Sequence, residues 1–374
     1  MVQIQKKLEM KLLANYLPGF HEDSFNNKWW YQGFTEWDNV KNASRLFKGH
    51  DQPRIPQTGY YNLASYDTIK EQSKLAKQFG ISGFVIYNYW YSGVKLLHKP
   101  LEILLANTDI EIEFAICWAN HDWTRSWSNR SGALDTLIKQ KYEIDEECFN
   151  HAKYLSYVFS DSRYIKINGK PIFQVYDLNK ENEIYLIEVK RLLKENYGID
   201  ILIVQTLKNK FEIKAKIADS VIYFQPSYNL IQKNSLLSNL TKRINKIPKL
   251  GKKYLYQLYD LLPDVSISLD YFSIMDAINL EYKNKKENSI LSIFIDFDNT
   301  PRYKKRARYF YNFDLNKFEE SLVQMLSKDS FGDIYVINAW NEWGEGMFLE
   351  PDQTYGFKKL EIIKRTISNF RTNL

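Results

Sequence analysis

The sequence of 374 residues has few of the side chains that build disulfides and metal sites. Its two cysteines, Cys117 and Cys148, are too few for a disulfide framework and lack the spacing of a metal site. They fit a reducing compartment, although so few cysteines are also compatible with export. The five histidines form no H-x-x-x-H pair. We therefore predict no metal and no cofactor.

Long apolar runs and phosphate-binding motifs are also missing. No apolar run reaches the roughly 18 residues that a membrane span needs. The N-terminal stretch MVQIQKKLEMKLLANYLPGF is interrupted by Lys11 and has no small-residue cleavage site, so it predicts a strand and not a signal peptide. No G-x-G-x-x-G or G-x-x-x-x-G-K-[ST] follows an apolar run, which weakens a nucleotide-binding fold. We expect a soluble, cytoplasmic protein.

Neither sign of charge dominates, but aromatic side chains are abundant. The net charge of +6 is mild for this length and does not indicate a nucleic-acid partner. Aromatic residues make up 16% of the chain, with 27 Tyr, 22 Phe and 9 Trp. Flat rings with a polar edge suit sugars, nucleobases and interfaces, whereas a large aromatic core is the simpler explanation. The positions of the rings along the chain are needed to separate these explanations.

Eight short apolar runs alternate with helical patterns along the chain. Apolar runs without alternation are typical of parallel strands covered on both faces. Eight of them with helices between predict an α/β fold, a (β/α)8 TIM barrel, and an open doubly wound sheet is the rival. The predicted strands are residues 11–20, 82–91, 111–120, 169–177, 199–206, 219–227, 289–299 and 332–340, and the predicted helices are 65–80, 100–107, 145–159, 181–196, 208–217, 313–328 and 357–371.

Two segments are longer than a minimal barrel needs. Residues 21–63 form a long loop after the first strand, and an insertion at about 228–288 precedes the seventh. We nevertheless predict one catalytic domain over residues 1–374. The basic section 241–260 is most simply a solvated helix. The sharper hypothesis is peripheral contact with the inner face of a membrane that carries a lipid-linked glycan.

Aromatic, amide and charged side chains gather where the predicted strands end, which is where a (β/α)8 barrel forms its active site. All nine tryptophans except Trp127, which lies slightly further along, are in these regions or in the loops just beyond, whereas core packing would place some in helices. Carboxylates and amides at a rim of flat rings describe a sugar-binding cleft. The predicted substrate-binding residues are Tyr16, His21, Trp37, Tyr87, Tyr89, Trp90, Trp118, Asn120, His121, Trp123, Arg125, Tyr176, Gln225, Asp298, Trp340, Asn341 and Trp343.

The stretch INAWNEWGEG, residues 337–346, ends the last predicted strand with two glutamates three residues apart. On a helical turn this spacing puts the β-carbons roughly 5–6 Å apart. Retaining glycosidases hold their two carboxyls about 5–5.5 Å apart, so the spacing is compatible with retention. Trp340 and Trp343 would form apolar walls that raise a carboxyl pKa, as a general acid requires. We predict Glu342 and Glu345 as the catalytic pair, although either glutamate could instead cap the following turn or pair with an arginine.

Asp296 and Asp298 form a D-x-D sequence on one face of a predicted strand. Many glycosyltransferases bind a metal–nucleotide complex through such a sequence, yet a bare D-x-D is common by chance. A structural aspartate bonded to Arg302 or to a backbone turn is the favoured interpretation.

Several motifs together resemble the WbsX-like family of surface-polysaccharide proteins, which is related to glycoside hydrolase family 99, the endo-α-mannosidase type. The motifs span about residues 16–357 in the family's order, and the resemblance implies a (β/α)8 barrel. They are YLPGFHED, WWYQGFTEWDNV, FVIYNYWYSGVKLL, CWANHDWTRSW, DNTPR and NAWNEWGEGMFLEPDQTYG.

The resemblance also implies roles for three glutamates. The family 99 motif E-W-x-E-G…E-P falls on Glu342, Glu345 and Glu350. Glu342 would then take the proton of the sugar 2-OH so that a 1,2-anhydro intermediate forms, and Glu345 would be the acid/base. Glu350 joins the predicted substrate-binding residues. In the family the third-strand motif usually reads W-A-N-E-x-W-T-R, but here His121 replaces the glutamate, so mannose specificity is not carried over.

Three functions are left open by the sequence. The first is a retaining, endo-acting glycoside hydrolase-like enzyme that acts on a glycan or lipid-linked oligosaccharide of bacterial surface-polysaccharide metabolism. The second is a glycosyltransferase or transglycosylase of O-antigen or capsule biosynthesis. The third is a non-catalytic glycan-binding barrel. Each takes an oligosaccharide or polysaccharide as its partner.

Overall fold

Eight parallel strands close into a barrel in the computed structural model, which describes residues 10–125, 135–230 and 264–372. β1 pairs with both β14 and β2, and this double pairing closes the sheet. The predicted (β/α)8 barrel is confirmed, and all eight predicted strands are present. Around the barrel they are β1 (Lys11–Tyr16), β2 (Gly83–Tyr91), β4 (Glu113–Trp118), β8 (Lys170–Val175), β9 (Leu202–Leu207), β10 (Ser220–Tyr223), β12 (Ser289–Phe294) and β14 (Ile334–Asn338).

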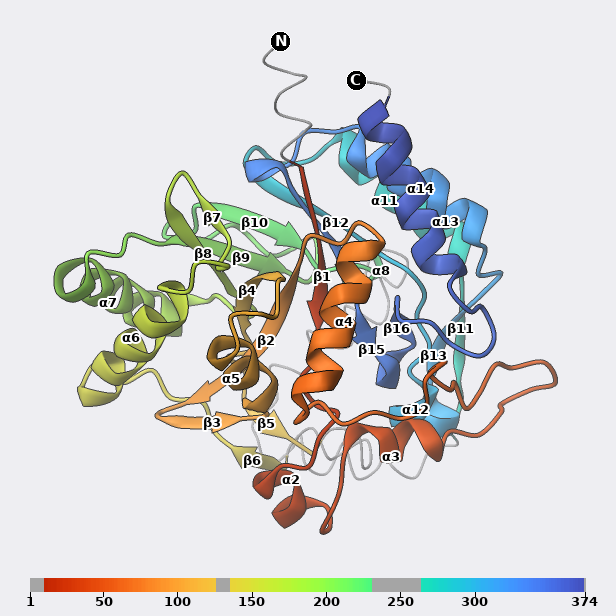
Figure 1. Cartoon of the computed structure of the whole chain (residues 1–374), viewed down its shortest axis with the longest axis horizontal. Coiled ribbons are helices and arrows are strands. Elements are labelled where there is room, and N and C mark those ends of the chain that lie inside the picture. The colour runs from red at the N-terminus through yellow and green to blue at the C-terminus, as the bar shows by residue number, and fades with distance from the viewer. Residues whose placement is uncertain (1–9, 126–134, 231–263, 373–374) are drawn as a thin grey trace.

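Helices surround this barrel (Figure 1). Their starts follow local side-chain chemistry: Asp145 accepts a hydrogen bond from the backbone N–H of Glu147, and Asn179 forms a capping box with Asn182. No helix of the described residues is long and apolar enough to cross a membrane. The long helices are α4 (Tyr66–Gln78), α5 (Lys99–Ala106), α6 (Glu146–Phe159), α7 (Lys180–Tyr197), α11 (Tyr271–Lys283), α13 (Leu315–Leu326) and α14 (Lys358–Thr372).

The strands are buried on both faces, as their uninterrupted apolar sequences predict. Every residue of β12 and of β14 is buried, and so is every residue of β1 after Lys11. Side chains that point into the barrel meet across it, and those that point outward meet the helices. The strand ends are therefore held rigidly, and the side chains that follow them have fixed places.

The sequence prediction is wrong for residues 208–217, which are not helical. The Gln205 side chain accepts from the backbone N–H of Ala215 at 2.7 Å and donates to the carbonyl of Ile213 at 3.2 Å, so this connection is held against β9. The sequence also missed α11, which lies within the predicted insertion and is joined to α13 by a bond from Asn279 to Ser321. The basic section 241–260 lies outside the described residues.

The long loop after β1 contains two short helices, α2 (Ser24–Trp29) and α3 (Glu36–Lys41). Thr35 caps α3, and its backbone N–H bonds Asp38 in return. Figure 1 shows both helices at the end of the barrel toward which the β1 arrow points, with α3 beside α12 (Thr300–Tyr303). The loop therefore brings residues from early in the chain to the C-terminal ends of the strands.

Candidate active site

A cavity of about 350 Å³ opens at the C-terminal ends of the strands. Side chains from the loop after β1, from β2, from the loops after β4 and β12, and from the end of β14 all line it. It is the place where a (β/α)8 barrel collects reactive groups. Of the residues predicted from the sequence, it brings together Tyr87, Tyr89, His121, Trp123, Tyr176, Glu342 and Glu345.

Glu342 and Glu345 reach this cavity from a compact turn. Glu342 ends β15 (Asn341–Glu342), one turn of 3-10 helix carries Glu345, and the chain returns in β16 (Met347–Phe348), antiparallel to β15. Gly346 permits the return because its φ is 69°, a conformation that favours glycine. Trp343 points the other way and stacks on Phe348 with ring centroids 3.6 Å apart. The spacing of three residues thus directs both carboxyls into one cavity.

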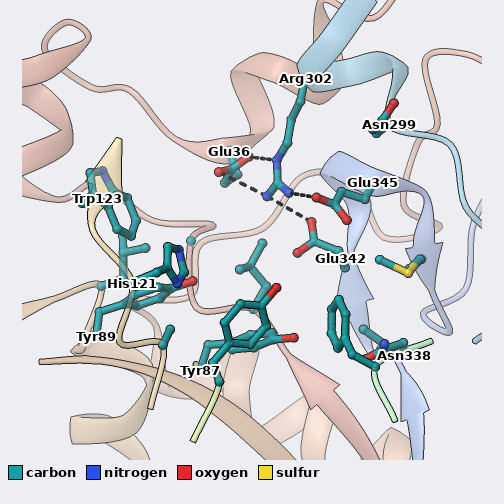
Figure 2. A pocket seen from close by; sticks show the side chains of 18 of the residues that line it. Glu36, Tyr87, Tyr89, His121, Trp123, Asn299, Arg302, Asn338, Glu342 and Glu345 are labelled. Carbon is teal, nitrogen blue, oxygen red and sulfur yellow. Dashed lines mark hydrogen bonds and ion pairs between the residues drawn. The ribbon is translucent and has the colours of Figure 1, made fainter. Parts of the chain in front are cut away.

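Arg302 of α12 holds the two carboxyls (Figure 2). Its Nη2 lies 3.1 Å from Oε1 of Glu342, and its Nη1 donates to Oε1 of Glu345 at 2.8 Å. Glu36, at the start of α3, lies against the same guanidinium with both of its contacts at 3.4 Å. A planar guanidinium offers several donors in fixed directions, so it can hold three carboxylates at once. The arginine pairing considered from the sequence occurs, and it involves both glutamates.

Burial controls the charge of the two glutamates differently. The Glu342 side chain is 10% exposed and that of Glu345 is 27% exposed. Burial raises the pKa of Glu342 well above its usual range, and Glu345 and Glu36 add to the rise, while Arg302 opposes it. Glu342 is therefore a carboxyl that can keep a proton near neutral pH, and Glu345 is the more accessible of the two.

Two glycines make room for this cluster. A β-carbon at Gly344 would lie 2.8 Å from Nε of Arg302, and one at Gly19 would lie 2.9 Å from Cγ of Glu36. Real β-carbons essentially never lie this close to a neighbouring heavy atom. Arg302 and Glu36 therefore occupy space that only glycine leaves open.

Aromatic rings form the wall that faces the carboxyls. Tyr89 meets Trp123 edge to face at 5.0 Å, and Tyr176 packs against His121 at 5.4 Å and Tyr87 at 6.3 Å. Burial lowers the pKa of His121, which favours the neutral imidazole. A flat apolar wall opposite hydrogen-bonding carboxyls suits a sugar ring, which has both apolar C–H faces and hydroxyl edges.

The other predicted substrate-binding residues do not line the cavity. Trp118, Trp340 and Trp343 are fully buried in the barrel, and the Asn341 side chain ties β15 to the Leu17 backbone at 2.7 and 2.9 Å. The Asn341 bonds fix the backbone of Leu17, which lines the cavity, although Asn341 itself does not. The predicted residues that are absent from the lining are Tyr16, His21, Trp37, Trp90, Trp118, Asn120, Arg125, Gln225, Asp298, Trp340, Asn341, Trp343 and Glu350.

Glu350 is buried behind Trp343. It accepts hydrogen bonds from the Tyr61 hydroxyl, the Gln72 amide and the Trp343 indole N–H, each at 2.7 Å. Burial nevertheless raises the pKa of Glu350 to about 7. Tyr61 and Gln72 hold the Glu350 carboxyl in place, and that carboxyl in turn holds the Trp343 indole. Trp343 belongs to the turn that carries the catalytic candidates, so this turn is held as well.

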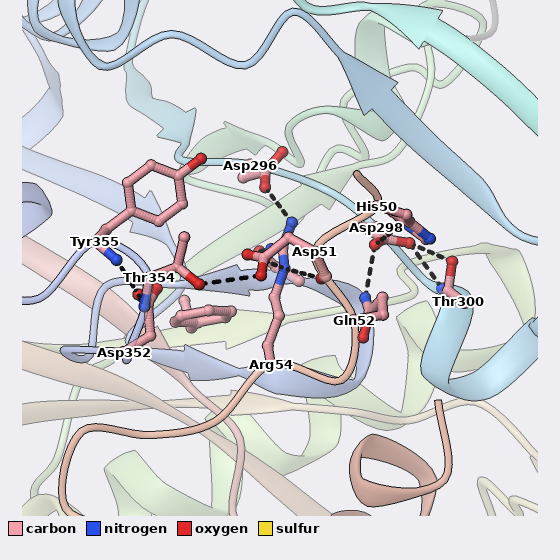
Figure 3. Close-up of polar contacts among 12 residues, drawn as sticks. His50, Asp51, Gln52, Arg54, Asp296, Asp298, Thr300, Asp352, Thr354 and Tyr355 are labelled. Carbon is pink, nitrogen blue, oxygen red and sulfur yellow. Dashed lines mark hydrogen bonds and ion pairs between the residues drawn. The ribbon is translucent and has the colours of Figure 1, made fainter. Parts of the chain in front are cut away.

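The D-x-D pair holds the long loop, and both aspartates bond the backbone of their own turn, which is one of the two kinds of partner predicted for them. Asp298 accepts from the backbone N–H of Thr300 at 3.0 Å, and Asp296 accepts from that of Phe297 at 2.8 Å. Asp296 pairs with Arg54 at 2.8 Å, and Asp298 accepts from His50 at 2.9 Å and from Gln52 at 2.6 Å (Figure 3). Burial acts to raise the pKa of Asp298, but hydrogen bonds and the charge of Arg54 lower it to about 2. No group of three His, Cys, Asp or Glu side chains in the described part of the chain is arranged to hold a metal ion.

Glu36 and Arg302 were not among the residues selected from the sequence, and Asn299, Tyr303 and Asn338 also line the cavity. Glu36 lies in the motif GFTEWDNV and Arg302 in DNTPR, so both were within the segments that carried the resemblance. Their contact joins positions 266 apart in the sequence. Spacing along the chain has no signal for such a pairing.

A family model described as Glycosyltransferase WbsX matches residues 12–363. The protein WxcX of Xanthomonas campestris pv. campestris is 28% identical over 378 residues, which cover 98% of this chain and 51% of WxcX. The chain thus spans about half the length of the curated relatives that it matches.

Solved structures share the barrel at low sequence identity. A glycoside hydrolase-like protein superposes with a TM-score of 0.57 at 13% identity, covering 96% of this chain and 94% of that one. The glycoside hydrolase family 99 endo-α-mannosidase from Bacteroides thetaiotaomicron gives a TM-score of 0.54 at 11% identity, covering 96% and 97%. At these identities the likeness shows the common fold.

Proposed function

The chain belongs to the glycosyltransferase WbsX family, and from its site we propose an enzyme that cleaves or transfers a glycosidic bond with retention of configuration. The observation that carries the proposal is that two carboxyls, Glu342 and Glu345, meet on the Arg302 guanidinium inside the cavity. The substrate would be a glycan or lipid-linked oligosaccharide of surface-polysaccharide metabolism.

The proposed reaction gives each carboxyl one proton to move. Glu342 takes the proton of the sugar 2-OH while the 2-oxygen attacks the anomeric carbon, and protonated Glu345 gives its proton to the departing oxygen. In the second half, Glu345 takes a proton from water or an acceptor hydroxyl as that oxygen attacks the anomeric carbon, and Glu342 returns its proton to the 2-oxygen. This second attack breaks the bond between the anomeric carbon and the 2-oxygen. Each half of the reaction inverts the anomeric carbon, so the product keeps the configuration of the substrate.

The geometry supports this division of roles. Glu342 is the deeper carboxyl, and burial makes it a stronger base than an ordinary glutamate, which suits it to a hydroxyl proton. Glu345 is the more exposed, as an acid/base that must meet both the leaving group and the incoming acceptor needs to be. Arg302 contacts both and keeps them at one place on the cavity wall.

A panel of bacterial polysaccharides and aryl glycosides tests the proposal, with release of reducing sugar or aryl alcohol as the readout. We expect Glu345→Gln and Glu342→Gln to lose at least about a hundredfold in turnover. Glu113→Gln is the matched control, because it removes the same charge at the N-terminal end of β4. Full activity of Glu345→Gln on a substrate that the wild type cleaves would refute the assignment.

A glycosyltransferase that uses a nucleotide sugar is the second candidate, and the description of the family favours it. Calorimetric titration with a panel of nucleotide sugars distinguishes the two, because only this second enzyme requires one as donor. Binding of a nucleotide sugar, with transfer to an acceptor that depends on it, would replace the first proposal. A glycan-binding barrel would be favoured instead if Glu342→Gln left the measured function intact.

A further inference from the structure

The cavity carries more negative than positive side chains. Among the described residues that line it, Glu36, Glu342, Glu345 and Asp122 are acidic, and Arg302 is the cationic one. One carboxyl could take up a proton and the carboxylates would still outnumber the guanidinium. A substrate that enters therefore meets an excess of negative charge, and the buried carboxyls among these groups are less screened than charges on the open surface.

Two cations near the cavity, both in the described part of the chain, already have carboxylate partners: Arg302 and Lys208. Arg302 has contacts of 3.4 Å or less with all three glutamates. Lys208 lies 5.1 Å over the ring of Tyr176, but it pairs with Asp177 at 3.4 Å. An anionic group on the substrate would have to compete with these carboxylates for a donor.

Glu36 has no part in the proposed proton transfers, yet it is buried beside them. Only 5% of the residue is exposed, and its backbone N–H bonds the Gly19 carbonyl at 3.3 Å. It occupies the Nε edge of the guanidinium, with Oε2 against Nε and Oε1 against Nη2. That edge is where a substrate carboxylate or phosphate would otherwise form paired hydrogen bonds with arginine.

We propose that Glu36 determines specificity by occupying Arg302, so that the cavity accepts an uncharged reacting sugar and rejects uronates, sugar phosphates and nucleotide diphosphates. This inference rests on the proposed glycan site and names the class of sugar that it takes. The Glu36 carboxylate acts mainly against the wrong ligand. An anionic ring would not pair with Arg302, and it would lie near the negative charges of the carboxyl cluster.

The test compares binding of uncharged and anionic forms of the same ring. Methyl hexopyranosides of the gluco, galacto and manno series, in both anomers, would be titrated beside the matching methyl hexuronides by ligand-observed NMR, with UDP as a further probe. We expect the wild type to bind at least one hexoside about tenfold or more tightly than its hexuronide. Glu36→Gln should reduce that ratio about threefold or more, and Glu113→Gln, the same change at the far end of the barrel, should leave it unchanged.

Each outcome decides one claim. A wild type that binds a hexuronide or UDP as tightly as any hexoside would overturn the inference while leaving a glycan site in place. If no sugar of either series binds, the proposed function fails and the inference fails with it. Discrimination that Glu36→Gln does not alter would refute the role of Glu36, and the wild-type comparison holds even if that variant does not fold.

Discussion

Replacing Arg302 by methionine should destabilise the fold by about 3–5 kcal/mol, because it leaves buried carboxylates without their common partner. The Arg302 side chain is 6% exposed and lies 2.8 Å from Glu345 and 3.1 Å from Glu342. Methionine keeps most of the side-chain volume, so the loss is one of charge and hydrogen bonding more than of packing. Solvent cannot easily replace the guanidinium around Glu342, which is nearly as buried.

The deficit should depend on pH in a defined direction. Folded Glu342 already binds its proton more tightly than an unfolded glutamate, whose pKa is near 4.5. Removing Arg302 removes a charge that lowers this pKa, so the folded pKa rises further. Between the unfolded and folded pKa values the native state binds more protons, and the free energy of unfolding therefore falls as pH increases. Each further unit by which the folded pKa of Glu342 rises costs about 1.4 kcal/mol of stability, and this loss is complete at pH values above the folded pKa.

Urea denaturation of the wild type and of Arg302→Met at about pH 5 and about pH 8.5 measures this deficit. We expect a larger deficit at the higher pH. Arg365→Met is the control, since it breaks a bidentate pair with Glu319 on the exposed surface and should cost far less at either pH. A deficit for Arg302→Met that is equal at both pH values, or that matches the control, would refute the electrostatic account of the site.

Three further predictions concern the same architecture. Gly344→Ala should displace Arg302, because the new β-carbon would lie 2.8 Å from Nε of its guanidinium. Turnover of a substrate that the wild type cleaves should then fall about tenfold or more. Unchanged turnover would show that Arg302 has room for the added methyl group. Because burial raises the pKa of Glu342, the rate should rise with pH along an acidic limb whose midpoint lies well above that of an ordinary carboxyl, and a limb near pH 4.5 would contradict this. Lys359→Met should cost about 3–5 kcal/mol in denaturant titrations, because it leaves Asp352 buried without its partner at 2.9 Å, and adding Asp352→Asn should recover part of the loss.

The strands could be predicted because each is a short apolar run with a single burial pattern. A strand covered on both faces needs no alternation, so runs such as 289–299 identify β12 directly. The helix predicted at 208–217 is wrong. Apolar residues fall at every second position of this segment, which is the period of a strand, and Gln205 binds the backbone of the segment and holds it in an irregular form. Tertiary hydrogen bonds overrode the local pattern there.

The place of the candidate site could also be predicted, but the direction of each side chain could not. Successive residues at the end of a strand point to opposite sides, so a cluster of aromatic residues there divides between cavity and core. Tyr87 and Tyr89 face the cavity, whereas Trp118 and Trp340 are fully buried in the barrel. All four are aromatic residues near a strand end, so their residue type does not predict which of them face the cavity. Their division depends on the register and tilt of the strands, which are properties of the closed sheet.

The cluster around Arg302 requires three distant segments to be in place together: the turn after β14, α12 and the long loop after β1. An ion pair from Arg54 to Asp296 and a hydrogen bond between His50 and Asp298 fasten that loop. The backbone N–H of Asp298 also donates to the Glu345 carbonyl at 2.7 Å, so the same aspartate that anchors the loop holds the turn that carries the two catalytic candidates. The D-x-D sequence therefore contacts both the turn that carries Glu345 and the loop that carries Glu36. The position of Glu345 depends on the attachment of that loop to the barrel. A mutation of Asp298 should for this reason disturb both carboxyls, although its own side chain lies outside the cavity lining.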